Sequence, residues 1–588
     1  MCGIVGYIGN KNTVKVLIDG LKELEYRGYD STGIAVLKLV NLEEKISSLA
    51  KETYELGIGH TRWATHGKPT ELNAHPHLGE YSYVVHNGII ENYKELKDEL
   101  IEKGHNFVSQ TDTEVIVHLF ESYNNELENT NESFKKTIEK LTGAFSILLI
   151  TKADPTKIFF FKNGSPLIVA RGKKNNEALL ASTDAPLIGL ATDVVYLEDG
   201  VGGVVDNGDI KFFSDNYSWS TLPSSKQFAQ KNGYRFFMEK EIYEQSDVVS
   251  DCLLGRIKDN EVLFEELDKN LLNGVNEIKI CACGTSYHAG LTASYLFERL
   301  SKVKCNVEIA SEFRYKEPLL TKDTLFIVVS QSGETADTLE ALKMAKNAGL
   351  KSIAICNVDN SSMTRMADYT ILTRAGIEKG VASTKAFSTQ TVVLWMLSLY
   401  LAKARKVINT KKMQEELHAL REVPKSLVIE NNIHEKTKRL SKRYLHGHGF
   451  FFIGRDVFFP LALEGALKLK EISYLHAEGY PAGEMKHGPI ALADPELFTI
   501  ALLPETLLID KIRSNVEELS ARDSTICTIS SLDFDSADDF IKIKKTDHFM
   551  LEFFEMLIAL QLLSMEISIR LGNDVDMPRN LAKSVTVE

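Results

Sequence analysis

The sequence has no excess of positive charge: 68 Lys and Arg residues stand against 81 Asp and Glu residues, a formal net charge of −13. Surfaces that bind nucleic acids or anionic membranes are basic, so the composition predicts a protein with neither partner. Long apolar runs are absent as well. The best stretch, residues 392–402, is far shorter than the ~18 residues that a membrane-spanning helix needs.

Cysteine is scarce in this sequence. The seven cysteines are scattered, and the close pair Cys281 and Cys283 does not have the spacing of a zinc site. The residues behind Met1 form neither the basic leader nor the long apolar core of a secretory signal. We therefore expect a cytoplasmic protein with reduced cysteines, no metal and no cofactor.

The chain is long enough for several domains. Its 588 residues predict roughly three to four domains of about 150 residues each. From the N-terminus to about residue 220, strands and helices interleave without a regular βαβ order. This pattern favours an α+β sandwich of antiparallel sheets and helices.

The first candidate site is the N-terminus itself, because Cys2 becomes the first residue once Met1 is removed. That residue then carries both a thiol and a free α-amine. The amine titrates at about pH 7.7–8.0, so it can take the proton of the thiol without help from a histidine. The alternative interpretation is a small buried residue at the start of a strand.

Two polar segments further along supply complementary groups. Residues 60–67 include Arg62, whose guanidinium can bind a carboxylate through two parallel hydrogen bonds. A predicted strand then ends on Asn87 and Gly88, which offer a side-chain amide and a backbone N–H to the oxyanion of an acyl-transfer reaction. Each segment also has an ordinary interpretation: Asn-Gly is a common turn, and residues 60–67 can form a surface loop.

A third polar segment contains Asp112 at the start of a predicted helix. Here Thr111 and Glu114 have the spacing of a helix capping box, so Asp112 can simply favour the helix N-terminus. Together with Cys2, however, the three segments supply a nucleophile with its own base, an oxyanion site, a carboxylate clamp and an ammonium anchor. This combination fits an amide substrate with an α-amino acid head group, which is glutamine.

Four motifs resemble the glutaminase domain of the N-terminal-nucleophile amidotransferases: residues 1–6, 26–31, 60–67 and 86–92. The resemblance implies an αββα fold, a thioester on Cys2 and an oxyanion held by Asn87 and Gly88. It also implies the glutamine-binding residues Arg62, Trp63, Thr65, His66 and Asp112. The segment between residues 40 and 57 looks shorter than in this family, which leaves the shape of that loop open.

The second half of the chain begins after a polar segment without periodicity. Buried strands then alternate with helices, as in a parallel α/β fold, and the alternation occurs twice. Strand ends at residues 284 and 330 are 46 residues apart, and their counterparts at 454 and 504 are 50 apart. We therefore predict two copies of one fold, in a chain organised as residues 1–218, a linker 219–235, the copies 236–425 and 426–575, and a tail 576–588.

Three hydroxyl-rich loops follow strands of the first copy. Each precedes a helix, where backbone N–H groups and the helix dipole can neutralise a phosphate. The alternative for each loop is a Ser or Thr that caps the helix N-terminus. Three such loops in one copy favour a small phosphorylated ligand, with the candidate residues Thr285, Ser286, Ser330, Gln331, Ser332, Thr335, Val381 and Ser383.

The second copy carries ionisable residues instead. Glu464, Lys468 and Glu471 are spaced to share one helical face, although a solvent-exposed ion pair is the ordinary explanation. His487 lies in a loop between glycines, and Lys583 lies in a tail without a core-forming pattern. Such tails usually fray, but a lysine among small residues can also fold over a site.

The second half resembles two sugar-isomerase domains, and its last residues, 578–588, are typical of the glutamine–fructose-6-phosphate aminotransferase family. The resemblance implies a homodimer that converts L-glutamine and D-fructose 6-phosphate to glutamate and D-glucosamine 6-phosphate. It also implies that ammonia passes internally between two sites and that Trp63 gates this passage. The expected fold class is thus an αββα glutaminase domain followed by two α/β sugar-isomerase domains with parallel sheets.

The resemblance also implies roles in the sugar half. His487 is a general acid and base in ring opening, Lys583 forms a Schiff base, and Glu471 transfers a proton, while Ala582 contacts the sugar. Two alternatives stay open: an amidotransferase that uses a phosphoribosyl acceptor, and a non-catalytic sugar-phosphate sensor. A ketose–aldose isomerase is a reduced form of the aminotransferase interpretation, since the sugar half alone can perform the isomerisation step.

Overall fold

The computed structural model describes residues 2–25, 28, 30–37, 56–63, 67–222, 231–268 and 270–586. The expected glutamine-binding residues Thr65 and His66 lie outside the described residues, as does most of the segment 40–57. Their expected roles and shape therefore stay predictions.

Contacts divide the chain into two compact units. The first comprises Met1–Phe228 and Ala582–Glu588, and the second comprises Ala229–Leu581. One division, after Phe228, lies inside the expected linker 219–235, and the other, after Leu581, lies inside the expected tail 576–588. The expected domain boundaries stay predictions. Each unit is described by itself.

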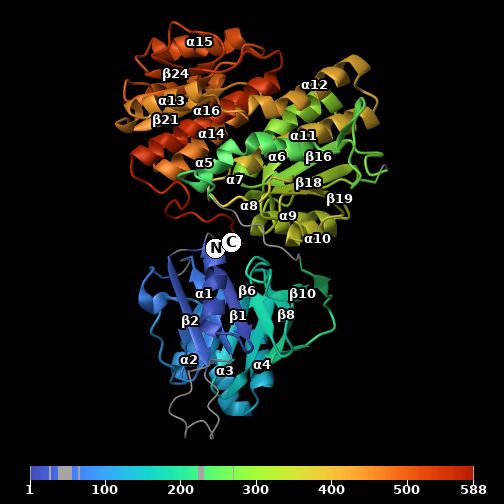
Figure 1. Cartoon of the computed structure of the whole chain (residues 1–588), viewed down its shortest axis with the longest axis vertical. Coiled ribbons are helices and arrows are strands. Elements are labelled where there is room, and N and C mark those ends of the chain that lie inside the picture. The colour runs from blue at the N-terminus through green and yellow to red at the C-terminus, as the bar shows by residue number, and fades with distance from the viewer. Residues whose placement is uncertain are drawn as a thin grey trace. The chain divides into compact units, whose positions relative to one another are not determined.

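The first unit contains two antiparallel sheets packed face to face (Figure 1). One has the strand order β13-β10-β8-β9-β1-β3-β2 and the other β12-β11-β7-β6-β5-β4. The strands are β1 (Gly3–Ile8), β2 (Ser31–Leu37), β3 (Leu56–Arg62), β4 (His77–Leu78), β5 (Ser82–Ile90), β6 (Gly143–Thr151), β7 (Asp154–Asn163), β8 (Ile168–Gly172), β9 (Ala178–Ala181), β10 (Ala191–Tyr196), β11 (Val201–Asp206), β12 (Asp209–Phe212) and β13 (Ser220–Thr221).

Helices cover both outer faces of this sandwich. Helix α1 (Thr13–Glu23) packs on the first sheet, and α2 (Tyr93–Glu102), α3 (Glu114–Leu127) and α4 (Thr130–Lys140) pack on the second. Asn12 caps α1 by accepting a hydrogen bond from the backbone N–H of Lys15 at 2.9 Å. All of β1 is buried because one face contacts α1 and the other contacts the second sheet. The predicted αββα arrangement is confirmed.

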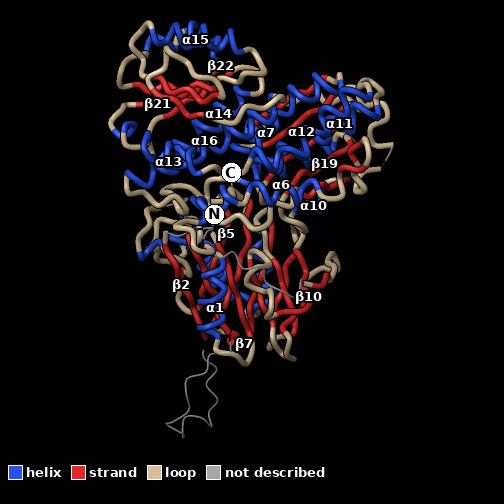
Figure 2. The backbone as a smooth tube through the Cα atoms, turned by 45° about the horizontal axis from the view of Figure 1, so that its top comes forward, coloured by secondary structure: helices blue, strands red, loops and turns tan. Residues whose placement is uncertain are grey.

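The second unit contains two five-stranded parallel sheets (Figure 2). Their strand orders, β17-β16-β18-β19-β20 and β22-β21-β23-β24-β25, are the same when counted along each copy, which confirms the predicted repeat. The strands are β16 (Glu277–Ala282), β17 (Lys304–Ile309), β18 (Thr324–Ser330), β19 (Lys351–Cys356), β20 (Tyr369–Leu372), β21 (Gly449–Gly454), β22 (Ala477–Pro481), β23 (Leu497–Leu502), β24 (Ile526–Ser530) and β25 (Asp539–Lys542), besides a short hairpin of β14 (Ile257–Lys258) and β15 (Glu261–Val262).

Helices cover both sheets of the second unit, and a continuous apolar core runs through both copies. The helices are α5 (Phe237–Tyr243), α6 (Gln245–Leu253), α7 (Gly284–Leu296), α8 (Ala310–Phe313), α9 (Ala336–Asn347), α10 (Ser362–Met366), α11 (Lys385–Ala404), α12 (Thr410–Ser426), α13 (Asn431–Leu440), α14 (Phe458–Ser473), α15 (Ile509–Ser520) and α16 (Phe549–Arg570). Helices α14 and α16 pack side by side, and α7 contacts both α11 and α14. The two copies therefore share a helical interface.

Among the described residues, the helices of this protein lack the combination of length and apolar character that crossing a membrane demands.

Candidate active sites in the two units

Cys2 lines a pocket in the first unit, immediately before β1. Its Sγ accepts a hydrogen bond from the backbone N–H of Trp63 at 3.1 Å, which holds the thiol against the end of β3. Burial raises the pKa of the Cys2 thiol, and the positive charge of Arg62 acts in the opposite direction. Arg62, Gly88 and Asp112 line the same pocket, so predicted residues from four separate segments converge there.

Asn87 and Gly88 lie inside β5, which pairs with β6 over its whole length, so the turn interpretation is wrong. The Nδ2 group of Asn87 donates to the backbone oxygen of Cys2 at 3.1 Å. Gly88 has a φ of +133°, and a Cβ atom at this position would lie 2.0 Å from the backbone oxygen of Ala144. Glycine is therefore required at this point of the pocket wall.

Asp112 belongs to the pocket and not to a capping box. Its Oδ2 atom accepts a hydrogen bond from the backbone N–H of Ile90 at 2.8 Å, which ties the loop before α3 to the end of β5. Glu114 does not bond back to Thr111: its carboxylate accepts two backbone N–H groups further upstream, with that of Ser109 at 2.7 Å. The capping-box interpretation is therefore wrong.

Arg62 is buried at the end of β3, with 3% of its surface exposed. Its guanidinium donates to the backbone oxygens of Gly67 at 3.2 Å and Lys68 at 3.4 Å. Burial lowers the pKa of Arg62, and the acidic groups of the pocket oppose this effect. Because both carbonyl contacts lie on the loop that follows β3, the guanidinium is held in place beside the thiol.

Four buried histidines adjoin this pocket: His60 on β3, His75, His77 on β4 and His86 on β5. We call them the histidine cluster. Sequence reasoning missed them as a group. A signal was present in their density, because five of the 15 histidines of the chain lie between residues 60 and 86.

In the second unit, two of the hydroxyl-rich loops lie at the carboxyl ends of parallel strands of the first sheet. Ser330 ends β18, and its Oγ accepts a hydrogen bond from the backbone N–H of Gly333 at 3.0 Å and lies 3.2 Å from Oγ1 of Thr335. Thr285 and Ser286 lie in the first turn of α7, directly after Gly284. In the described structure neither α7 nor α9 has a side-chain cap, so the helix-cap interpretation is wrong for these two helices.

The third hydroxyl-rich loop, with Val381 and Ser383, precedes α11. Here the carboxylate of Glu378 accepts a hydrogen bond from the hydroxyl of Ser383 at 3.1 Å. It also accepts hydrogen bonds from the backbone N–H groups of Thr384 and Ala386 at 3.0 and 3.1 Å. A carboxylate of the protein thus occupies the N-terminus of α11.

Glu464, Lys468 and Glu471 share one face of α14, on which Glu464 and Lys468 are buried and Glu471 is partly exposed. Lys468 is 1% exposed, and its Nζ lies 3.4 Å from Glu464 and 2.7 Å from Glu471. Oγ1 of Thr285 donates a hydrogen bond to Oε1 of Glu464 at 3.0 Å, and Nδ1 of His288 lies 2.8 Å from Oε2 of the same carboxylate. The exposed-pair interpretation is wrong: the charged helix of the second copy contacts a hydroxyl-rich loop of the first.

Three predicted residues of the sugar half remain: His487, Ala582 and Lys583. His487 is an exposed residue at the end of the partly buried 3-10 helix η6 (Ala482–His487), and no interaction among the described residues links it to Glu471. Ala582 and Lys583 belong to the segment that groups with the first unit. Their roles at a sugar site stay predictions.

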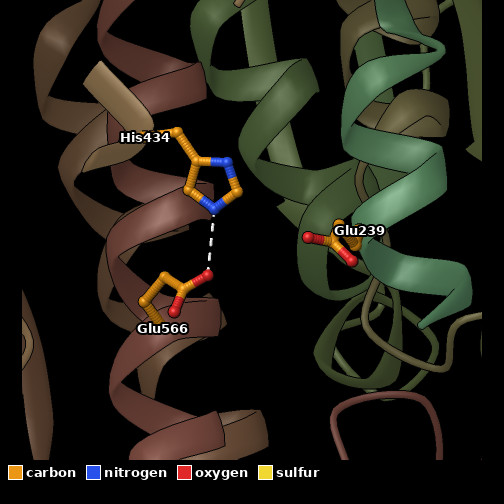
Figure 3. A group of neighbouring side chains, drawn as sticks. All are labelled: Glu239, His434 and Glu566. Atoms are coloured by element: carbon orange, nitrogen blue, oxygen red, sulfur yellow. Dashed lines mark hydrogen bonds and ion pairs between the residues drawn. The ribbon is translucent and has the colours of Figure 1, made fainter. Parts of the chain in front are cut away.

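The described residues contain one group of three potential metal ligands: Glu239, His434 and Glu566 (Figure 3). Nε2 of His434 lies 2.9 Å from Glu566, and Tyr243 bonds the other ring nitrogen at 2.7 Å. The guanidinium of Arg235 bonds Glu239 at 2.7 Å and Glu566 at 2.8 Å. A cation of the protein already lies between the two acids, so we interpret the group as an ion-pair network that joins α5, α13 and α16.

Comparison with known families gives matches in both units. Residues 1–187 match the glutamine amidotransferase domain family, and residues 271–400 and 447–563 match the SIS domain family. The C-terminal domain of glucosamine-fructose-6-phosphate aminotransferase from Francisella tularensis superposes with a TM-score of 0.57 at 40% identity. The superposition covers 60% of this chain and 100% of the Francisella tularensis chain.

Two curated relatives extend the similarity over the whole chain. The glutamine–fructose-6-phosphate aminotransferase (isomerizing) of Campylobacter jejuni is 60% identical over 604 aligned residues, which cover 100% of both chains. The protein of the same name from Helicobacter pylori is 51% identical over 600 residues, again with 100% of both chains covered. This chain therefore belongs to the glutamine–fructose-6-phosphate aminotransferase (isomerizing) family of enzymes.

Proposed function

We propose that the enzyme transfers the amide nitrogen of L-glutamine to D-fructose 6-phosphate and releases glutamate and D-glucosamine 6-phosphate. The observation that carries the proposal is the convergence of Cys2, Arg62, Gly88 and Asp112 on one pocket. It is supported by the second unit, in which the charged face of α14 meets a hydroxyl-rich loop. The two units thus have the groups for two half-reactions.

In the glutamine half-reaction, the thiolate of Cys2 attacks the amide carbon of glutamine. The α-amine freed by removal of Met1 takes the thiol proton and returns it to the leaving ammonia. Nδ2 of Asn87 and the backbone N–H of Gly88 stabilise the oxyanion. Water then hydrolyses the thioester to glutamate. Arg62 binds the α-carboxylate of glutamine and Asp112 binds its α-ammonium group. The other glutamine-binding residues lie nearby: Trp63, Thr65 and His66.

In the sugar half-reaction, hydroxyl and backbone N–H groups hold fructose 6-phosphate: Thr285, Ser286, Ser330, Gln331, Ser332, Thr335, Val381, Ser383 and Ala582. His487 moves the proton that opens the ring, and the amine of Lys583 forms a Schiff base at the C2 carbonyl with loss of water. Ammonia displaces the lysine, and Glu471 transfers a proton from C1 to C2. The enzyme acts as a homodimer, and ammonia reaches the sugar unprotonated along an internal passage gated by Trp63.

A coupled assay tests this proposal directly. The purified chain receives glutamine and fructose 6-phosphate together, and both products are quantified. We expect glutamate and glucosamine 6-phosphate to form in equal amounts. Glutamate without the amino sugar would reduce the proposal to a glutaminase, and neither product would leave only the sugar-phosphate sensor.

Gly88→Ala is expected to lower the kcat of glutamine hydrolysis by about 10²-fold or more, because displacing one oxyanion donor costs about 10²–10³-fold. The added Cβ would lie 2.0 Å from the backbone oxygen of Ala144, so β5 has to shift. The matched control is Gly104→Ala, since Gly104 also has a positive φ but its Cβ meets nothing within 4 Å. Equal kcat values for the two variants would contradict the assignment of Gly88.

An N-terminal extension ahead of Cys2 is expected to abolish glutamine-dependent synthesis while sugar-phosphate binding persists. The reason is chemical: an acylated nitrogen cannot take the proton of the thiol, whereas a free α-amine with a pKa of about 7.7–8.0 can. The control is the same protein after a protease has removed the extension and left Cys2 first. Full activity of the extended protein would show that the free-amine mechanism is wrong.

A further inference from the structure

The histidine cluster has no role in the reaction described so far, yet it contacts both walls of the glutamine pocket. His60 touches Asn87, which supplies an oxyanion donor. His75 and His86 both lie within hydrogen-bond distance of Thr113, the neighbour of Asp112, at 3.3 and 3.0 Å. All the members are buried. Burying four imidazoles together is costly unless their polar atoms are bonded, so the arrangement calls for a physical reason.

The ring of His60 contacts two oxygens with one nitrogen. Nε2 lies 3.0 Å from the backbone oxygen of His86 and 3.2 Å from Oδ1 of Asn87. A backbone carbonyl only accepts hydrogen bonds, so Nε2 has to carry the proton. Burial lowers the pKa of His60 to about 3, which keeps the ring neutral at every working pH. His60 is therefore a fixed N–H donor, and its one Nε2 hydrogen is shared between the backbone oxygen of His86 and Oδ1 of Asn87.

This donor determines which way the carboxamide of Asn87 faces. With Oδ1 toward His60, Nδ2 points to the other side and donates to the backbone oxygen of Cys2 at 3.1 Å. A flipped amide would place two donors against each other at His60 and two oxygens against each other at Cys2. It would also present an oxygen, and not an N–H, to a developing oxyanion. Only one of the two orientations supports acyl transfer.

We propose that His60 is a positioning residue of the glutamine half-reaction, whose Nε2–H holds the Asn87 carboxamide with Nδ2 toward the oxyanion. The inference rests on the proposed function, because it assigns Asn87 an oxyanion to stabilise. His60 does not touch the substrate in this account. It acts through Asn87.

The rest of the cluster holds this ring in place. The rings of His60 and His75 stack with their centroids 4.1 Å apart and an interplanar angle of 14°. The His75 ring is in turn anchored, because its Nδ1 lies 3.4 Å from the backbone N–H of His86. A stacked imidazole is planar and has few rotatable bonds. It therefore maintains the direction of its N–H better than a flexible amide does.

The test compares two substitutions of the same residue. His60→Leu removes the donor and is expected to lower the kcat of glutamine hydrolysis about 10²–10³-fold, the usual cost of losing an oxyanion-hole donor, with little change in KM. His60→Gln places an amide N–H near the position of Nε2 and is expected to recover at least about tenfold of that loss. If the leucine variant does not fold, His60→Asn replaces it, since its shorter amide does not reach Asn87.

Two further readouts separate positioning from a merely structural role. Alkylation of Cys2 by iodoacetamide needs the thiolate but develops no oxyanion, so its rate is expected to stay close to that of the wild type in every His60 variant. In a double-mutant cycle, His60→Leu is expected to cost little in an Asn87→Ala background, because its effect requires the carboxamide.

Several results would overturn the proposal. One is a wild-type kcat in His60→Leu; another is an equal loss in the Leu and Gln variants. Parallel losses of hydrolysis and of Cys2 alkylation would assign His60 a structural role, and additive losses in the double mutant would separate it from Asn87. A wild-type protein that hydrolyses no glutamine at all would instead refute the proposed function, and this inference with it.

Discussion

The Cys2→Ala variant is expected to lose glutamine-dependent synthesis by at least about 10³-fold, the scale seen when a covalent nucleophile is removed. Without the thiol no thioester forms, so the pocket can bind glutamine but cannot release its nitrogen. Binding of fructose 6-phosphate is expected to persist, because the hydroxyl-rich loops belong to the other unit. Glutamate release and titration of the sugar phosphate measure the two halves separately.

The chain offers a matched control for this variant. Cys283 is also a free, partly buried cysteine, and it lies in the second unit. Cys283→Ala is therefore expected to hydrolyse glutamine at the wild-type rate. Residual synthesis near the wild-type level in Cys2→Ala would contradict the nucleophile assignment, as would a loss of sugar binding together with hydrolysis.

The Lys468→Met variant is expected to lower the free energy of unfolding of the second unit by about 3–5 kcal/mol, the cost of breaking a buried ion pair from one side. Lys468 lies 3.4 Å from Glu464 and 2.7 Å from Glu471, and it is 1% exposed. Methionine leaves both carboxylates without their common cation. Urea titration measures the loss, and synthesis of the amino sugar is expected to fall with it.

The control for this second prediction lies two residues away on the same helix. Lys470 is exposed, so Lys470→Met is expected to change the free energy of unfolding very little. Equal effects of the two substitutions would contradict the role of the buried lysine.

The pH dependence of this contribution has a definite sign. Burial lowers the pKa of Lys468, but the carboxylates of Glu464 and Glu471 outweigh burial and raise it above its ordinary value. The stability that the lysine contributes is therefore fully present below the unfolded pKa of about 10.4 and is lost only as pH rises beyond it. The difference between wild type and Lys468→Met is expected to stay constant between about pH 6 and pH 8.

Much of the lining of the Cys2 pocket was predictable from sequence, because its residues belong to short local segments with recognisable chemistry. A cysteine behind Met1, an Asn-Gly pair at a strand and an arginine next to an aromatic residue can each be recognised without coordinates. The repeat of the second unit was predictable for a related reason. Strands such as β18 and β23 are buried on both faces, so they are continuous apolar runs that stand out between helices.

Other elements escaped prediction for physical reasons. Strand β22 contains Gly479 and Pro481, which have low β propensity, and it exists because it pairs with β21 at a sheet edge. Helix α16 is buried almost all round, so it has little of the amphipathic period that identifies surface helices. The histidine cluster joins residues of β3 and β5 in different sheets, and its members meet only when the sheets pack.

The central claim is that one chain passes nitrogen from glutamine at Cys2 to a sugar phosphate in the second unit. The most direct measurement follows that nitrogen: the enzyme is given glutamine labelled with nitrogen-15 in its amide, fructose 6-phosphate and an excess of unlabelled ammonium. The account predicts glucosamine 6-phosphate that carries almost entirely labelled nitrogen, with one glutamate for each amino sugar. An amino sugar containing mainly unlabelled nitrogen would contradict it.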